Sequence, residues 1–166
     1  MSDNVILIGM PGAGKSTVGV VLAKTLGMNF LDSDLVICNR TGQPLQETLD
    51  KIGLEAFLSL EAEVIRGLTL RRTVLATGGS VPMREEAMAH LKEQGTVVYL
   101  EVPYPELERR LKNITTRGIA FGPGEDLRSL MERRTPVYEH WADITVQATP
   151  GCDLEAMVAA VAEALK

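Results

Sequence analysis

A short apolar run that leads into a glycine-rich loop, with a helical pattern behind it, constrains the fold of this chain more than any other feature. Val5–Ile8 is apolar throughout and predicts a buried strand, and Ser16–Leu26 carries apolar residues at helical spacing. The connecting segment "GMPGAGKS" matches the pattern G-x-x-x-x-G-K-[ST]. A strand and a helix joined in this way predict one unit of a layered α/β fold.

The rest of the chain repeats this alternation of short apolar runs and longer helical patterns. We expect further strands at 29–31, 73–76, 96–100 and 143–146, and further helices at 34–40, 44–52, 53–68, 84–94, 105–112, 126–140 and 153–166. Nearly continuous apolar strands are typical of a parallel sheet with helices on both faces. The sequence therefore predicts a three-layer α/β/α fold with a five-stranded parallel sheet, as a single domain over residues 1–166.

The glycine-rich loop predicts a P-loop that binds ATP and Mg²⁺. Inward-pointing N–H groups and the start of the next helix bind phosphate oxygens, Lys15 reaches the β- and γ-phosphates, and the Ser16 hydroxyl can ligate Mg²⁺. The sequence lacks the [NT]-K-x-D pattern that reads guanine in GTPases, and it has no long apolar strand that ends in a metal-binding Asp. A small-molecule kinase is therefore favoured over a GTPase or an ATP-driven motor. The expected nucleotide-binding residues of the loop are Gly9, Met10, Pro11, Gly12, Ala13, Gly14, Lys15, Ser16 and Thr17.

Two carboxylates, Asp32 and Asp34, follow the second predicted strand and should lie near the P-loop, because ligands bind beyond the carboxyl ends of parallel strands. One carboxylate can help to hold Mg²⁺, and the other can accept the proton of a substrate hydroxyl. Either aspartate could instead cap the helix that follows, and capping is compatible with both roles.

These features resemble the shikimate kinase family over nearly the whole chain. The resemblance rests on "GMPGAGKST", "LDSDLV", "LATGG" and "RRTPVYEHWAD", together with Arg117. It implies ATP-dependent transfer of a phosphoryl group to the 3-hydroxyl of shikimate, with an acceptor-binding region at about 33–61. Asp34 would bind the acceptor hydroxyls and act as the base, Asp32 would help with the metal, and Arg134 would pair with the substrate carboxylate. Arg134 could also be a solvated or ion-paired helix residue.

The resemblance also implies roles in a loop, in a lid and at the nucleotide base. Gly78 and Gly79 would present backbone N–H groups to the substrate, and Arg110 would lie against the adenine. The segment at about 113–125 has the length and the glycine and proline content of a mobile lid. Arg117 would move with this lid onto the transferring phosphoryl group, where a cation stabilises the developing charge. The alternative is an exposed arginine on an ordinary loop.

Two positions depart from the family pattern on the acceptor side. In "GLEAFLSLE", Leu58 stands where the family has an arginine that binds the substrate carboxylate, and "ATGGSV" has Ser80 after two glycines instead of three. Truncation of a bidentate contact of this kind typically costs about 2–5 kcal/mol. Arg134 could bind shikimate alone, Arg66 or Arg84 could substitute, or the acceptor could be another hydroxy acid or polyol. A degenerate relative that binds ATP with little turnover is a further alternative.

Composition limits the partners of this chain. The formal net charge is −5 over 166 residues, which argues against general binding of nucleic acid. The N-terminal apolar run is too short for a membrane span and lacks a preceding basic segment, so we expect no membrane partner and a cytoplasmic location. The two cysteines are not expected to form a disulfide. We expect a monomer that acts on a small hydroxy acid.

Overall fold

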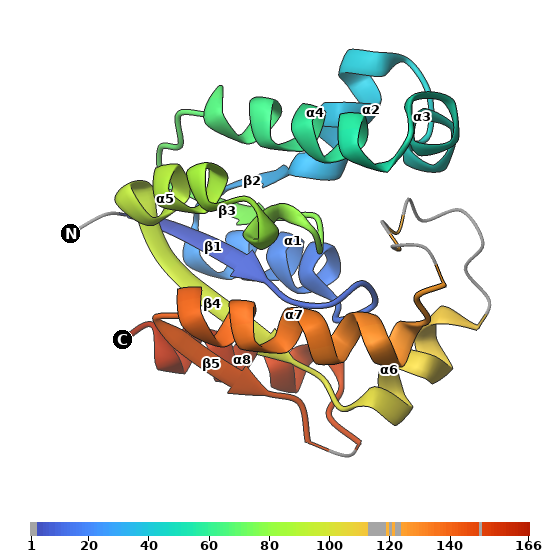
Figure 1. The fold of residues 1–166 in the computed structure, drawn as a ribbon. Coiled ribbons are helices and arrows are strands. Elements are labelled where there is room, and N and C mark those ends of the chain that lie inside the picture. Colours follow the sequence, from blue (N-terminus) through green and yellow to red (C-terminus); the bar gives the residue numbers. More distant parts are fainter. Residues whose placement is uncertain (1–2, 113–118, 120, 122–123, 150) are drawn as a thin grey trace.

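The computed structural model describes residues 3–112, 119, 121, 124–149 and 151–166, and Figure 1 shows how they are arranged. Five parallel strands form one sheet in the order β2-β3-β1-β4-β5. The predicted five-stranded parallel sheet is therefore confirmed. The strands are β1 (Asn4–Ile8), β2 (Asn29–Asp32), β3 (Thr73–Ala76), β4 (Gly95–Glu101) and β5 (Ile144–Gln147).

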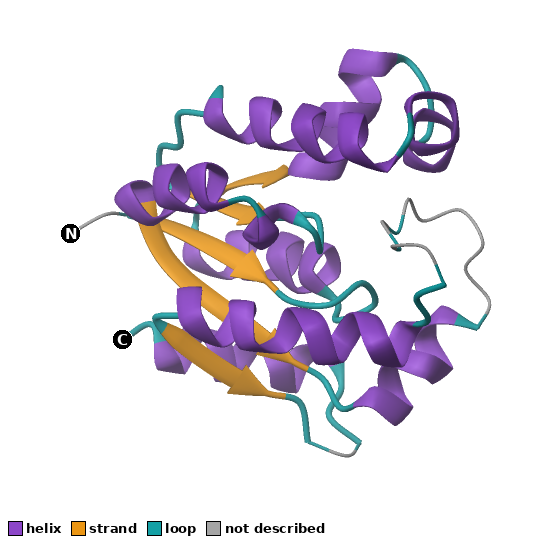
Figure 2. Cartoon of the chain, in the orientation of Figure 1, coloured by secondary structure: helices purple, strands orange, loops and turns teal. Residues whose placement is uncertain are grey.

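Helices cover both faces of the sheet, as the three-layer prediction requires (Figure 2). Helices α1 and α8 pack together on one face, whereas α5 and α7 lie on the other. Helices α2, α3 and α4 contact one another beside the edge that β2 forms. The helices are α1 (Lys15–Leu26), α2 (Ser33–Thr41), α3 (Leu45–Ile52), α4 (Leu54–Arg66), α5 (Glu85–Gln94), α6 (Tyr104–Leu111), α7 (Leu127–Trp141) and α8 (Leu154–Ala164), with a short 3₁₀ turn, η1 (Val81–Met83).

The central and edge strands differ in how completely they are buried. All residues of β1 and β3 are buried, which agrees with their apolar sequences. The edge strands β2 and β5 each expose part of their length. The strands in the middle of the sheet are therefore buried more completely than the two edge strands, each of which has only one neighbouring strand.

Capping residues set where the helices begin and end. The side chain of Asp32 accepts hydrogen bonds from the backbone N–H groups of Asp34 (2.8 Å) and Leu35 (3.4 Å), so Asp32 is the N-cap of α2. Gly27 ends α1 in the left-handed conformation, with φ of 66°, which glycine adopts readily. The capping alternative is thus confirmed for Asp32.

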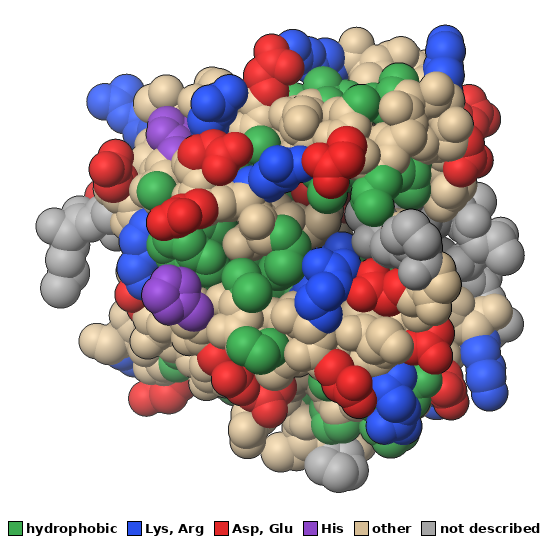
Figure 3. Space-filling model, in the orientation of Figure 1, with side chains coloured by type: hydrophobic (Ala, Val, Ile, Leu, Met, Phe, Trp, Pro, Cys, Tyr) green, Lys and Arg blue, Asp and Glu red, His purple; other side chains and the backbone are tan. Residues whose placement is uncertain are grey.

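The surface carries charges of both signs. Figure 3 shows acidic and basic side chains interspersed over the face that it presents. No helix within the described part of the chain is both long and apolar enough to cross a membrane.

Candidate active site

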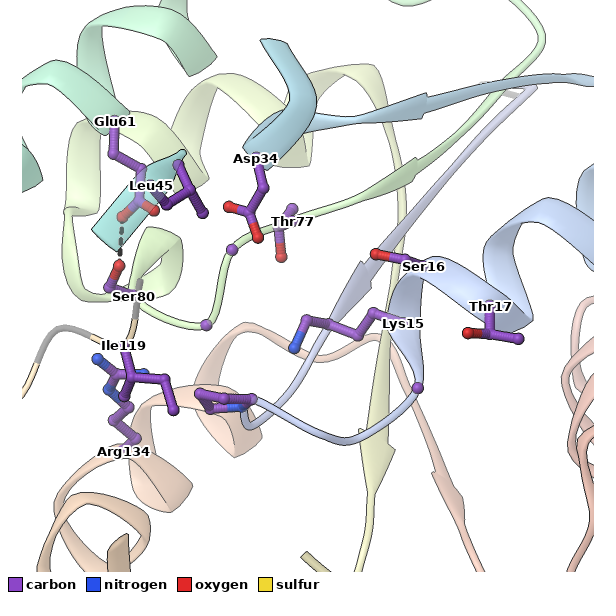
Figure 4. Close-up of a pocket in the computed structure, with 14 residues that line it drawn as sticks. Lys15, Ser16, Thr17, Asp34, Leu45, Glu61, Thr77, Ser80, Ile119 and Arg134 are labelled. Atoms are coloured by element: carbon purple, nitrogen blue, oxygen red, sulfur yellow. Dashed lines mark hydrogen bonds between the residues drawn. The ribbon is translucent and has the colours of Figure 1, made fainter. Parts of the chain in front are cut away.

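A pocket lies at the carboxyl ends of the central strands, where the parallel sheet was expected to bind its ligand (Figure 4). The P-loop and the start of α1 form one side of this pocket, and the opposite side is formed by α2, α3, α4, the loop after β3, and α7. The lining residues are Pro11, Gly14, Lys15, Ser16, Thr17, Asp34, Leu45, Glu61, Thr77, Gly78, Gly79, Ser80, Ile119 and Arg134.

The P-loop has the backbone geometry that its glycines allow. Gly9, Gly12 and Gly14 have φ of 149°, 84° and 88°, values that side chains other than glycine rarely adopt. A Cβ atom on Gly9 would also lie 2.8 Å from the carbonyl oxygen of Leu100. Lys15 folds back over the loop and donates hydrogen bonds to the carbonyls of Gly9 (2.7 Å) and Met10 (2.8 Å). The loop is therefore a shaped cradle with its lysine held over it.

Ser16 and Asp32 lie next to each other beside this cradle. The Ser16 hydroxyl donates a hydrogen bond of 2.5 Å to Oδ2 of Asp32, and Oδ1 of the same carboxylate caps α2. A hydroxyl and a carboxylate oxygen are hard ligands of the kind that Mg²⁺ prefers alongside phosphate and water. The two predicted metal-site residues therefore fit the ion that the P-loop pattern implies.

Asp34 faces the P-loop from the opposite side of the pocket, from the first turn of α2. Gly78 lies between this carboxylate and that of Glu61: a Cβ atom on Gly78 would come within 2.8 Å of Asp34 Oδ1 and 2.7 Å of Glu61 Oε2. The N–H group of Gly78 donates to the Ser33 hydroxyl (3.0 Å), so in this structure it is already engaged within the protein. Gly78 therefore contributes to the pocket wall by lacking a side chain, which leaves the space between the two carboxylates open.

Arg134 enters the pocket from α7 and is only 2% exposed. A Cβ atom on Gly79 would lie 2.9 Å from Nη1 of Arg134, so the guanidinium sits directly against that glycine. Its burial overturns the alternative of a solvated surface arginine. A buried guanidinium at the wall of a polar pocket is suited to binding a carboxylate.

Tyr138 lies one turn after Arg134 on α7 and contacts both the loop after β3 and the P-loop. Its hydroxyl donates a hydrogen bond of 2.7 Å to the carbonyl of Gly79 and lies 3.9 Å from the sulfur of Met10. Burial raises the pKa of Tyr138 to about 12, so the phenol stays protonated and remains a donor.

Glu61 is a pocket residue for which the sequence alone indicated no role. It is 2% exposed, it projects from α4, and its carboxylate accepts a short hydrogen bond from the Ser80 hydroxyl. Burial raises the pKa of Glu61 to about 7, because desolvation penalises its charged form. The available signal was its spacing, since Glu61 follows buried Phe57 by four residues and precedes buried Val64 and Ile65.

A second, more apolar pocket adjoins the far side of the P-loop. Arg110 of α6 lines it together with Gly12, Gly14 and Val102. The guanidinium of Arg110 donates to the carbonyl of Gly12 (3.0 Å) and to Glu106 (2.9 Å), and both contacts hold it beside the loop. This position agrees with the prediction that Arg110 lies against a nucleotide base, and the role itself stays a prediction.

Several predicted residues lie elsewhere. Arg117 lies outside the described residues, and its role stays a prediction. Leu58 is half-buried on α4 one turn before Glu61, but it is not among the residues that line the pocket. Arg84 pairs with exposed Glu55 at 3.2 Å, and Arg66 is exposed. Neither of these arginines lines the pocket, so neither replaces the missing cation in this structure.

Comparisons with known proteins agree with the geometry. The family model for shikimate kinase matches residues 11–166. A shikimate kinase of Paracidovorax citrulli is 41% identical, over 96% of this chain and 90% of its own. The solved structure of a shikimate kinase from Acinetobacter baumannii in complex with shikimate has 33% identity and a TM-score of 0.89, and the match covers 98% of this chain and 92% of that chain.

A differently named relative also matches nearly the whole chain. Threonine synthase-like 1 of Pongo abelii is 35% identical over 98% of this chain, which corresponds to 22% of that longer protein. The family-model match, the sequence identities and the shared fold show that this chain belongs to the shikimate kinase family.

Proposed function

We propose that this protein transfers the γ-phosphoryl group of ATP to the 3-hydroxyl of shikimate. The observation that carries the proposal is one pocket with two unlike sides: the P-loop with Lys15 and Ser16 on one side, and Asp34 with buried Arg134 on the other. The first side suits a nucleotide, and the second suits a small molecule that bears a hydroxyl and a carboxylate. Membership of the shikimate kinase family supports the same reaction.

On the donor side, the P-loop residues Gly9–Thr17 bind the phosphates of ATP, and Arg110 lies against the adenine. Lys15 exchanges its present bonds to the carbonyls of Gly9 and Met10 for phosphate oxygens, where it offsets their charge. Ser16 and Asp32 would hold Mg²⁺, which would neutralise charge on the phosphates. This arrangement prepares the γ-phosphorus for attack.

On the acceptor side, Arg134 holds the carboxylate and Asp34 receives the hydroxyl. A bond forms between the acceptor oxygen and the γ-phosphorus as the bond from that phosphorus to the β–γ bridging oxygen breaks. The hydroxyl proton passes to Asp34, and the products are ADP and a phosphate ester. Gly78 and Gly79 let the acceptor approach the backbone closely.

Further parts of the proposal concern the regions around the pocket. The lid at about 113–125 closes over the site and brings Arg117 to the phosphoryl group, and Ile119 from this segment already lines the pocket. The acceptor-binding region at about 33–61 contributes Asp34, Leu45 and Glu61. We also propose a cytoplasmic monomer of one domain, without nucleic-acid or membrane partners, and the net charge of −5 supports the nucleic-acid part of this view.

A coupled assay of ADP release tests the proposal, with shikimate, related hydroxy acids and uncharged polyols as acceptors. Release that depends on shikimate and yields the 3-phosphate ester is the expected result. Slow ATP hydrolysis that no acceptor stimulates would instead identify a nucleotide-binding relative with little turnover. Activity on uncharged polyols alone would identify a polyol kinase. This is the second candidate function, and the observation behind it is Leu58 in place of the arginine that the family pattern has.

A further inference from the structure

Among the described residues that line the acceptor side of the pocket, carboxyl groups outnumber cations. Arg134 supplies one cation, whereas Asp34 and Glu61 supply two carboxyl groups, and Lys15 lies at the P-loop, where it bonds to the carbonyls of Gly9 and Met10. A hydroxy acid with one carboxylate would add a further negative charge. A molecule that brings both a carboxylate and a cation would match this set of groups more closely, because each of its charges would then face an opposite one.

Glu61 is the group that such a cation would meet. One of its oxygens accepts the hydrogen bond from Ser80, while Oε2 faces the space over Gly78, which Asp34 Oδ1 also faces. Only a glycine leaves this space open, because a Cβ atom at position 78 would collide with both carboxylates. The space therefore offers two carboxylate oxygens to a small donor group.

The three glutamates of α4 differ in whether a lysine or arginine lies within ion-pair distance of the carboxylate. Exposed Glu55 pairs with Arg84 at 3.2 Å, and exposed Glu63 pairs with Arg40 at 3.0 Å. Among the described residues, no lysine or arginine lies within 4 Å of buried Glu61, and the position one turn earlier on its helix holds Leu58. The most deeply buried of the three glutamates thus lacks the close cation that each exposed one has.

We infer that the acceptor side also takes small hydroxy amino acids, whose ammonium group binds Glu61 while the carboxylate binds Arg134 and the hydroxyl faces Asp34. The transfer step rests on the proposed function and has the same balance, with the hydroxyl proton passing to Asp34 and ADP leaving. An ammonium beside Glu61 supplies the opposite charge that a buried carboxylate requires. Leu45 and Ile119 cover the carbon chain of the acceptor.

The pH dependence of binding follows from the groups that face Glu61. These are Asp34 on α2, Ser80 before η1, Arg134 on α7 and Lys15 on α1. Because the pKa of Glu61 is raised to about 7, its carboxylate becomes charged as the pH rises through that value. Affinity for an ammonium-bearing acceptor should therefore rise between about pH 6 and pH 8, while affinity for a purely anionic acceptor should fall.

The experiment compares L-homoserine with 4-hydroxybutyrate, which has the same carbon chain and hydroxyl but no amine. Initial rates at saturating Mg-ATP give kcat/KM for both compounds with wild type, Glu61→Gln and the exposed control Glu63→Gln. We expect wild type and the control to favour L-homoserine by about tenfold or more. In Glu61→Gln the preference should fall to within about threefold. Leu58→Arg, which leaves Glu61 in place, should also reduce it by placing a cation on the same face of α4.

Binding measured by calorimetry, with a non-hydrolysable ATP analogue present, separates this inference from the proposed function. Phosphorylation of shikimate without any preference for L-homoserine over 4-hydroxybutyrate overturns the inference and leaves the proposed function standing. Binding of L-homoserine that depends on Glu61, without transfer to any acceptor, supports the inference and contradicts the proposed function. Equal weak binding of both compounds in wild type and in Glu61→Gln overturns the inference whatever the rates are.

Discussion

The two sides of the pocket are built in different ways. One continuous segment, the P-loop with the start of α1, forms the side that we propose for the nucleotide, and most of the groups expected to bind phosphate there belong to the backbone. The acceptor side is assembled from side chains on separate elements, among them Asp34 on α2, Glu61 on α4 and Arg134 on α7. A backbone cradle keeps its chemistry when neighbouring side chains change, whereas a single substitution can alter the charge of the other side. We therefore expect phosphate binding and acceptor choice to be separable in this fold.

The largest effect is expected on the nucleotide side, from the one side chain of the cradle that carries charge. Lys15→Ala should lower kcat/KM for ATP by roughly 10³- to 10⁵-fold, because a cation at the transferring phosphoryl group stabilises its transition state. Calorimetric titration of ATP and steady-state rates measure the loss, and exposed Lys24→Ala on the same helix is the matched control. Unchanged affinity and turnover in Lys15→Ala would mean that the loop is not a phosphate site.

On the acceptor side, Asp34→Asn should affect the chemical step and spare the nucleotide. The amide has the size of the carboxylate but cannot take a proton, so kcat should fall by roughly 10²- to 10⁴-fold while ATP affinity stays within about twofold. Asp50→Asn, at an exposed position on α3, is the control. An equal loss of ATP affinity in Asp34→Asn would show that the two sides are not separable.

The buried carboxyl group of Glu61 should make stability depend on pH. Its pKa is about 7 in the folded state and 4.5 for the unperturbed group, so the folded protein binds this proton more tightly. The resulting stabilisation is complete below about pH 4.5 and is lost as the pH rises through about 7, up to about 3 kcal/mol. Urea unfolding of wild type and Glu61→Gln at several pH values tests this point. Parallel pH profiles for the two proteins would contradict it.

The smallest expected effect is a gain at position 58. Leu58→Arg adds a guanidinium one turn before Glu61 and should lower KM for shikimate about tenfold, or about 1.4 kcal/mol, with a smaller change in kcat. Steady-state kinetics across shikimate concentration measure this effect, and Leu26→Arg, at an exposed position on α1, controls for added charge. An unchanged KM would show that position 58 does not reach the acceptor.

Most of the fold could be predicted from local patterns. The apolar runs identified every strand, and glycine, proline and capping residues marked the helix ends to within a few residues. The turn Val81–Met83 was not predicted, because three residues carry no periodic signal. The exposure of β2 and β5 was also missed, since edge positions depend on the strand order, which alternation alone does not reveal.

The parts of the site that lie in one short segment could be predicted from the sequence, whereas contacts between distant segments could not. The P-loop and the Asp32–Asp34 pair are short patterns beside strands, and in the structure Asp34 lines the same pocket as the P-loop while Asp32 bonds to Ser16 of that pocket. The contact between Glu61 and Ser80 joins residues 19 positions apart on different elements, so no spacing rule could predict it. The same holds for the engagement of the Gly78 N–H group by Ser33, 45 positions away.

The contacts of Tyr138 have a consequence for how the protein is made. Its hydroxyl reaches Gly79 across 59 positions of sequence and lies against Met10 across 128, so both sides of the pocket depend on a helix near the end of the chain. Contacts over such separations form late, because a long loop must close first. During synthesis the P-loop leaves the ribosome long before α7 does. A nascent chain can therefore present its glycine-rich loop early, but it acquires a complete site only after α7 has emerged.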